Sequence, residues 1–186
     1  ARALVVRPSW LLLDEPLAHL DGAARQEVFD LLRTALARTR AGVLLATHNA
    51  AEALRIADDV LILLDGRLVQ AGPAERVYRE PVNLAAARVL GDAGELRGRA
   101  GDGTLTADGQ MVLDGLDQQL SGEQALILRP EDVEFRPDDS GPAKVRRCEL
   151  TPGGWRLTVA VAGQQLCVFS RRAVPADTPG RLHRAG

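Results

Sequence analysis

The sequence predicts an α/β unit followed by a small, mostly β unit. Three short apolar runs, at residues 10–13, 43–47 and 60–64, alternate with segments of helical periodicity in the first part of the chain. Strands that alternate with helices are typical of parallel α/β sheets, and unbroken apolar runs are typical of strands buried on both faces. After Pro81, glycine, aspartate and proline interrupt short apolar segments at close spacing, which is typical of small barrels or sandwiches.

The first part of the chain contains clear boundary signals for its elements. Residues 1–6 are typical of a helix end, because a proline at position 8 disfavours helix in the residue before it. Asp21 is a plausible N-cap for a helix over residues 22–39, whose apolar side chains recur at helical spacing. Asp65-Gly66 is a hairpin turn signal that follows the third apolar run. Further helices are expected at residues 50–57 and 73–79.

The second part of the chain is expected to contain several short strands. Residues 124–128 and 143–150 are strand candidates, and residues 155–161 and 164–170 flank Gly163 as a hairpin would. The predicted organisation is an α/β part at residues 1–81, a helical connector at residues 82–94, and a β part at residues 95–186.

Composition excludes several classes of protein. The 186 residues carry 23 basic and 25 acidic side chains, which argues against a nucleic-acid binder with a dominant basic surface. Cys148 and Cys167 are far apart in the sequence, and this favours small core residues over a metal site or a disulfide framework. No apolar run approaches the roughly 20 residues needed to cross a bilayer. The chain begins with Ala1 rather than methionine, so we expect a fragment of a longer protein.

Two carboxylates follow the first apolar run. Asp14 and Glu15 stand where a buried strand would emerge at its carboxyl end, which is where open α/β sheets bind ligands. Because side chains alternate along a strand, the two carboxylates cannot point the same way. This predicts that the two carboxylates have separate roles, one binding a metal ion and the other a water molecule.

Several motifs in the first 80 residues occur in the order found in the second half of an ABC-transporter ATPase subunit. The motifs are Leu11-Leu12-Leu13-Asp14-Glu15-Pro16, Ala18-His19-Leu20-Asp21, Ala46-Thr47-His48, Ala51-Glu52-Ala53 and Ile56-Ala57-Asp58. The first three resemble the Walker B strand with its following glutamate, the D-loop and the switch-histidine loop of that family. Ala18 departs from the pattern, because the family's D-loop usually opens with serine.

The resemblance implies a role for each site residue. Asp14 would hold Mg²⁺ through water molecules, and Glu15 would orient and polarise the attacking water as the general base. His48 would contact the γ-phosphate of ATP, and Asp21 would reach across a dimer interface. The expected cofactors are therefore ATP and Mg²⁺, and the expected fold of this part is the C-terminal part of a P-loop NTPase.

The nucleotide site is incomplete in this sequence. There is no Gly-x-x-x-x-Gly-Lys-Ser/Thr phosphate loop, and the only lysine, Lys144, has no such loop around it. The 186 residues alone are therefore predicted neither to bind nor to hydrolyse ATP. The stretch Leu120-Ser121-Gly122-Glu123-Gln124 is similar to the ABC signature, but it follows Walker B instead of preceding it and leads into a predicted strand. We interpret it as a coincidence, because a signature needs a helix N-terminus to contact phosphate.

The second part resembles the TOBE domain, a small OB-like barrel at the end of importer ATPases. The similarity lies in Ile127-Leu128-Arg129-Pro130-Glu131-Asp132-Val133. It implies an importer for an inorganic ion such as iron, molybdate or sulfate, or for a sugar or polyamine. The implied partners are a second ATPase subunit, transmembrane permease subunits and, indirectly, an extracytoplasmic solute-binding protein. The implied location is peripheral, at the cytoplasmic face of the inner membrane, with no nucleic-acid partner. Arg129, Arg146 and Arg147 are candidates for contact with a transported oxyanion.

Two other interpretations remain open from the sequence. A DNA-repair or chromosome-maintenance ATPase shares Walker B, D-loop and switch histidine, but it would need long coiled-coil or DNA-binding insertions. A non-catalytic regulatory module would fit the β part alone, since OB-like barrels also bind oligonucleotides. The aromatic content of 3% argues against base stacking as its use.

Overall fold

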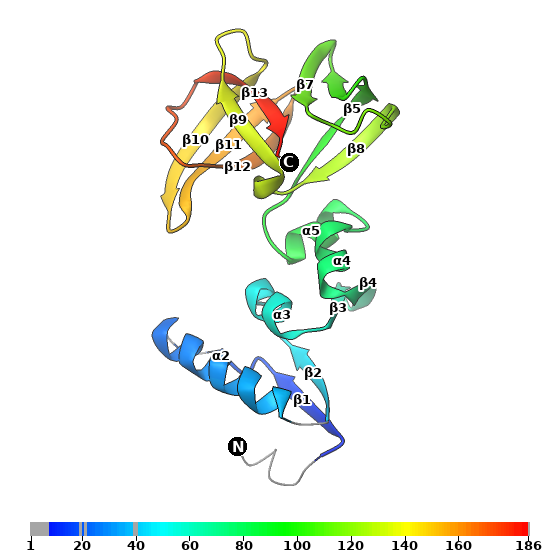
Figure 1. Cartoon of the computed structure of the whole chain (residues 1–186), viewed down its shortest axis with the longest axis vertical. Coiled ribbons are helices and arrows are strands. Elements are labelled where there is room, and N and C mark those ends of the chain that lie inside the picture. The colour runs from blue at the N-terminus through cyan, green and yellow to red at the C-terminus, as the bar shows by residue number, and fades with distance from the viewer. Residues whose placement is uncertain (1–7, 19, 21, 39–40, 186) are drawn as a thin grey trace. The chain divides into compact units, whose positions relative to one another are not determined.

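The computed structural model divides the chain into two compact units, residues 1–80 and 81–186 (Figure 1). It describes residues 8–18, 20, 22–38 and 41–185. The helix end expected at residues 1–6 and the side chains of His19 and Asp21 lie outside the described residues.

The first unit begins with a β-α-β crossover. Strand β1 (Trp10–Asp14) pairs in parallel with β2 (Gly42–Ala46), and helix α2 (Gly22–Ala37) connects them. Trp10 lies opposite Gly42, where a Cβ atom would come within 2.7 Å of the indole ring, so the glycine leaves room for the tryptophan. The two strands and the helix predicted for this segment are confirmed.

The remainder of the first unit is a helix followed by a hairpin and a second helix. Helix α3 (Ala50–Ile56) precedes β3 (Asp59–Leu64), which pairs antiparallel with β4 (Arg67–Pro73), and α4 (Ala74–Arg79) follows. Asp65 and Gly66 have φ values of 49° and 71°, as a tight turn between two strands requires. The predicted hairpin is therefore confirmed, and its second strand extends to Pro73.

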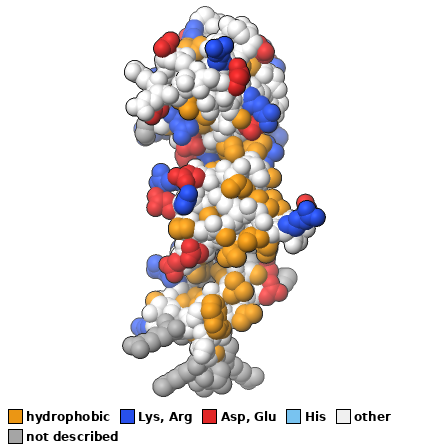
Figure 2. All heavy atoms as spheres, turned by 90° about the vertical axis from the view of Figure 1, so that its right-hand side faces the viewer, with side chains coloured by type: hydrophobic (Ala, Val, Ile, Leu, Met, Phe, Trp, Pro, Cys, Tyr) orange, Lys and Arg blue, Asp and Glu red, His pale blue; other side chains and the backbone are white. Residues whose placement is uncertain are grey.

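The prediction that the apolar runs are buried on both faces is wrong for the described structure. In β3, Val60 and Ile62 are buried, while Leu61 and Leu63 are exposed. The reason is that β1–β2 and β3–β4 are separate two-stranded sheets, so alternate side chains face away from any described layer. Figure 2 shows apolar side chains gathered on one face of this unit. The large exposed apolar side chains on its strands are Trp10, Leu12, Leu44, Leu61, Leu63 and Leu68.

The second unit consists of helix α5 (Leu84–Val89) and one nine-stranded sheet. Its strands are β5 (Gly94–Gly101), β6 (Thr104–Ala107), β7 (Gln110–Asp114), β8 (Gly122–Leu128), β9 (Val133–Pro137), β10 (Ala143–Thr151), β11 (Gly154–Val161), β12 (Gln164–Ser170) and β13 (Pro179–Arg184). Their order is β12-β11-β10-β13-β7-β6-β5-β8, with β9 also paired to β13. A single 3-10 turn, η1 (Pro130–Asp132), separates β8 from β9.

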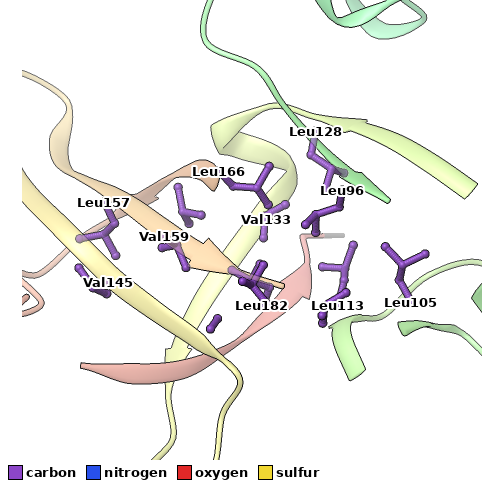
Figure 3. Close-up of a cluster of buried hydrophobic side chains, with 14 of the residues drawn as sticks. Leu96, Leu105, Leu113, Leu128, Val133, Val145, Leu157, Val159, Leu166 and Leu182 are labelled. Atoms are coloured by element: carbon purple, nitrogen blue, oxygen red, sulfur yellow. The ribbon is translucent and has the colours of Figure 1, made fainter. Parts of the chain in front are cut away.

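The sheet of the second unit curls around one apolar core (Figure 3). The core includes Leu96, Leu105, Leu113, Leu128, Val145, Leu157 and Leu182, each buried to within 1% exposure. The predicted mostly β unit is confirmed as a nearly closed, barrel-like sheet. Its nine strands exceed the five of an OB barrel, so the OB-like arrangement stays a prediction.

Strand β12 comes close to β5 and narrows the opening of the barrel. A Cβ atom on Gly94 would lie 2.4 Å from a methyl carbon of Leu166, so glycine is needed where the two strands approach. Among the described residues, no helix is both long enough and apolar enough to cross a membrane.

Candidate functional site

The parallel pairing of β1 and β2 brings the predicted site residues to one edge of the sheet. Asp14 is the last residue of β1 and lies opposite Ala46, the last residue of β2. Glu15 follows the first strand directly, and His48 follows the second by two residues. The carboxyl ends of adjacent parallel strands thus carry Asp14, Glu15 and His48, at the edge where open α/β sheets bind ligands.

Glu15 leaves the strand with an unusual backbone conformation. Its φ of 44° lies in the left-handed region, which is uncommon for residues with a Cβ atom and recurs at functional sites. Its N–H donates to the carbonyl oxygen of Ala46 at 2.9 Å, so the ladder between the two strands extends by one further bond. The left-handed backbone conformation and this hydrogen bond together fix the position of the Glu15 backbone, from which its carboxylate extends.

The Glu15 carboxylate contacts His48 at two points. Its Oε1 accepts a hydrogen bond from the backbone N–H of His48 at 2.8 Å, and the same oxygen lies 2.7 Å from the ring Nδ1. Because an ionised carboxylate can only accept, Nδ1 must carry the proton in this contact. The ring Nε2 is then left for another partner, on a side chain that is 82% exposed.

The contact with His48 also sets the charge of Glu15. The hydrogen bond from the His48 ring is the main cause that holds the pKa of Glu15 below its ordinary value of 4.5; burial is the next cause and raises the pKa, and the backbone hydrogen bond from His48 lowers it further. Glu15 is therefore ionised at neutral pH and can accept a proton from a bound molecule.

Asp14 is suited to a metal ion only as one ligand among several. Within the part of the chain that the structure describes, its exposed carboxylate has no hydrogen-bond or ion-pair partner, and no group of three or more His, Cys, Asp or Glu residues could hold a metal ion. Mg²⁺ is commonly bound by one or two carboxylates together with water and substrate phosphates. Asp14 fits that mode and does not fit an all-protein metal cage.

One buried carboxylate beside His48 was not among the site residues predicted from the sequence. Glu52, on α3, is buried, and its carboxylate accepts hydrogen bonds from Thr47 and Asn49 on either side of His48. The available signal was the spacing of Asn49 and Glu52, because an asparagine N-cap followed three residues later by glutamate is typical of a capping box. Asp21 lies outside the described residues, so its place relative to these groups is still a prediction.

The lysine and the signature-like stretch, which could be mistaken for parts of a phosphate site, have other local structures. The only lysine, Lys144, pairs with Asp177 at 3.0 Å in the second unit. Gly122, in the stretch similar to the ABC signature, has a φ of 79° and begins strand β8, with no helix following. The interpretation of that stretch as a coincidence is therefore supported by its local structure.

Two of the three arginines proposed for an oxyanion have partners within the second unit, and the third, Arg146, is exposed on β10. Arg129 is buried, and its guanidinium donates to the carbonyl oxygen of Ala87 in α5 at 3.3 Å. Arg147 is exposed and pairs with Glu149 on the same strand at 2.9 Å. Arg129 thus links helix α5 to the sheet by a hydrogen bond, and this structural role was not predicted from the sequence.

Comparison with known proteins gives a consistent set of relatives. No protein-family model matches the chain. The Fe(3+) ions import ATP-binding protein FbpC of Pseudomonas fluorescens is 36% identical over 169 residues, covering 88% of this chain and 47% of the relative. The glucose import ATP-binding protein GlcV of Saccharolobus solfataricus is 34% identical over 181 residues, which cover 91% of this chain and 50% of the relative. The sulfate/thiosulfate import ATP-binding protein CysA 1 of Chromobacterium violaceum is 34% identical over 184 residues, which cover 96% of this chain and 51% of the relative.

These homologues are import ATP-binding proteins. The chain spans about half the length of the curated relatives it matches. The similarity runs through both units, since the alignment with CysA 1 covers 96% of the chain.

Proposed function

We propose that this chain forms part of the ATP-hydrolysing subunit of an ABC importer. The observation that carries the proposal is the contact of Glu15 with His48 across the ends of two adjacent parallel strands. Asp14, at the same edge, and the import ATP-binding relatives support it. The transported solute belongs to the classes named for such importers, namely an inorganic ion, a sugar or a polyamine.

In the proposed reaction, Glu15 acts on water and His48 acts on phosphate. The ionised carboxylate of Glu15 orients the attacking water and accepts its proton. The His48 ring donates from Nδ1 to Glu15, and its Nε2 faces an oxygen of the γ-phosphate. The two side chains therefore link the presence of the phosphate to the position of the base.

Asp14 and Asp21 complete the proposed roles. Asp14, together with water, would hold Mg²⁺, which supplies charge neutralisation on the phosphates of ATP. Asp21 is proposed to reach toward a second ATPase subunit. Permease subunits and an extracytoplasmic solute-binding protein complete the proposed assembly, at the cytoplasmic face of the inner membrane. The second unit is proposed to be the TOBE domain of this subunit.

The apolar face of the first unit supports the view that the working protein contains more of the sheet. Leu12 is 71% exposed and Leu44 is 52% exposed, on the two strands of a parallel pair. Parallel sheets are almost always covered on both faces. A larger α/β domain that contributes the phosphate loop would cover these side chains and supply the groups for ATP that this sequence lacks.

The proposal is tested by removing the base. In the intact ATPase, Glu15→Gln should preserve Mg-ATP binding and lower turnover by about 100-fold or more, because general-base catalysis contributes roughly that much. Glu27→Gln, which changes an exposed carboxylate on α2, is the matched control and should hydrolyse ATP at the wild-type rate. Wild-type turnover in Glu15→Gln would refute the role of Glu15.

The 186 residues alone give a second test. Titration of this chain with Mg-ATP in a calorimeter should show no binding at micromolar concentrations, because the phosphate loop is absent. A micromolar dissociation constant would contradict the proposal that the nucleotide is held mainly by groups outside these residues.

A further inference from the structure

Glu52 is one of two buried charged residues among those described, with 8% of its surface exposed. Burial of a carboxylate is costly unless its oxygens are hydrogen-bonded. Both oxygens have partners here, since Oε2 accepts from the hydroxyl of Thr47 at 3.1 Å and Oε1 accepts from Nδ2 of Asn49 at 2.9 Å. The two partners are the residues immediately before and after His48.

The same three residues are joined by further hydrogen bonds. The backbone N–H of Asn49 donates to the hydroxyl oxygen of Thr47 at 3.0 Å. The side-chain oxygen of Asn49 accepts from the N–H of Ala51 at 3.1 Å and caps helix α3. Thr47, Asn49 and Glu52 thus form a closed ring of bonds around the backbone of His48, which we term the His48 clasp.

The His48 clasp matters because the His48 side chain has little packing of its own. The ring is 82% exposed, and among the described residues it contacts the Glu15 carboxylate. An exposed ring takes its position from its backbone. The backbone of His48 is held at its own N–H by Glu15 and on both flanks by the clasp.

Helix α3 is itself attached to α2, so the clasp has a fixed base. Arg55, one turn after Glu52, stacks over the ring of Phe29 at 4.1 Å from its centroid and donates to Gln26 at 3.1 Å. Phe29 is buried in α2. The position of His48 therefore depends on a helix that is anchored away from the site.

We propose that Glu52 is a positioning residue for His48: it holds Thr47 and Asn49 so that the His48 ring keeps its contact with Glu15. This inference rests on the proposed function of Glu15 and His48. An ordinary capping box would use the glutamate only to complete the helix N-terminus. Here the carboxylate reaches back past the N-cap to Thr47, which is a contact that α3 does not need.

The kinetic test uses the intact ATPase. Glu52→Ala should lower kcat by about 10- to 100-fold with a KM for ATP within about threefold of wild type, because a misplaced catalytic group loses rate without losing ground-state binding. Glu52→Gln should recover part of the lost kcat, since its amide oxygen can still accept one of the two bonds. Glu75→Ala, which removes an exposed carboxylate on α4, is the control and should leave both constants unchanged. A kcat within about twofold of wild type in Glu52→Ala would overturn the proposal.

A second pair of variants separates positioning from folding. Thr47→Val removes both bonds of the hydroxyl at nearly constant volume, whereas Thr47→Ser keeps the hydroxyl. Thr47→Val should reproduce the loss of kcat, and Thr47→Ser should not, at equal unfolding temperatures. If the kcat of each variant tracks only its fraction of folded protein, Glu52 is merely structural and the proposal fails.

A measurement without ATP keeps this inference distinct from the proposed function. In the NMR spectrum of the 186-residue chain, the amide and ring resonances of His48 should shift in Glu52→Ala and stay near wild type in Glu75→Ala. Unchanged His48 resonances would overturn the positioning role whatever the ATPase assay shows. An intact wild-type protein that does not hydrolyse ATP would refute the proposed function, while the resonances would still decide the role of Glu52.

Discussion

The Oε1 atom of Glu15 accepts a hydrogen bond from the backbone N–H of His48 and lies 2.7 Å from its ring nitrogen, across 33 positions of sequence. This contact predicts that Glu15 protects the His48 amide from exchange with solvent. In Glu15→Ala, the His48 amide should exchange several-fold faster, because its acceptor is lost. In Glu15→Gln, the amide oxygen replaces the carboxylate oxygen, and exchange should stay close to wild type. Hydrogen exchange followed by NMR checks this, and equal exchange in both variants would contradict the contact.

The sequence was sufficient to predict which strand ends carry the candidate site. Asp14 and Glu15 were identifiable because they end an apolar run, and His48 because Ala46-Thr47-His48 resembles the switch-histidine loop of ABC ATPases. Parallel strands align their carboxyl ends, and this brings the three residues to one edge. Glu52 was not identifiable as a site residue, because its burial and its bond to Thr47 depend on how α3 packs after β2. A side chain that positions a functional group leaves only a weak local pattern in the sequence.

Gln164 connects β12 through its side chain to Arg97 of β5, which lies before the stretch of β5 that pairs with β6. Its Oε1 accepts from the N–H of Arg97 at 2.7 Å, and its Nε2 donates to the carbonyl oxygen of Arg97 at 3.2 Å. The side-chain amide of Gln164 therefore makes the same pair of hydrogen bonds with Arg97 that a neighbouring strand would make, between β12 and β5, which are not paired through their backbones. Gln164→Ala should lower the free energy of unfolding of the second unit by about 1–2 kcal/mol, since two hydrogen bonds of ordinary net strength are lost. Urea denaturation measures the change.

The neighbouring residue provides the control for Gln164. Gln165 is exposed on the same strand, and Gln165→Ala should alter stability by less than about 0.5 kcal/mol, as surface substitutions usually do. Equal effects at the two positions would show that the Gln164 bonds do not close the barrel.

Gly98 allows the backbones of β5 and β6 to approach each other. A Cβ atom at this position would lie 2.5 Å from the carbonyl oxygen of Thr106, and a backbone atom cannot move aside as a side chain can. Gly98→Ala should therefore destabilise the second unit by about 1–3 kcal/mol, which is typical of overpacking. Gly101 lies on the same strand, and a Cβ atom there would meet nothing within 4 Å. Gly101→Ala should leave the urea midpoint unchanged or slightly raised, and a larger loss there than at Gly98 would contradict the prediction.

The second unit was less predictable than the first because its pairings are non-local. Strands β11 and β12 were expected as a hairpin across Gly163, and β10 was expected as a strand, without its pairing to β11. Strand β13 pairs in parallel with β7 at a single position, His183 with Asp114, whose side chains are also hydrogen-bonded. Such a pairing joins segments about 70 residues apart and leaves no signal in either segment alone. The exposure of Leu12 and Leu61 was also unpredictable, because burial depends on how many layers cover a strand.

Asp138 gives the second unit a defined response to acid. Its Oδ2 accepts a hydrogen bond from Arg181 at 2.6 Å, and its Oδ1 accepts from the backbone N–H and the hydroxyl of Ser140. The bond from Arg181 is the largest cause that lowers the pKa of Asp138 from 3.8 to about 2, followed by the bonds from Ser140. A carboxyl group with a lowered pKa in the folded state stabilises the fold above its unfolded pKa and loses that contribution as the pH falls. The loss should therefore occur between pH 3.8 and about 2.

The variant Asp138→Asn tests this pH dependence. It should be less stable than wild type at pH 6, and the difference in urea midpoint should shrink as the pH falls from 3.8 toward about 2, because the wild-type carboxylate becomes protonated there. Asp139→Asn alters the adjacent exposed carboxyl group, which lies outside these hydrogen bonds, and its stability should follow the wild-type pH profile. A difference between Asp138→Asn and wild type that stays constant down to pH 2 would show that the bonds to Arg181 and Ser140 do not depend on the charge of Asp138.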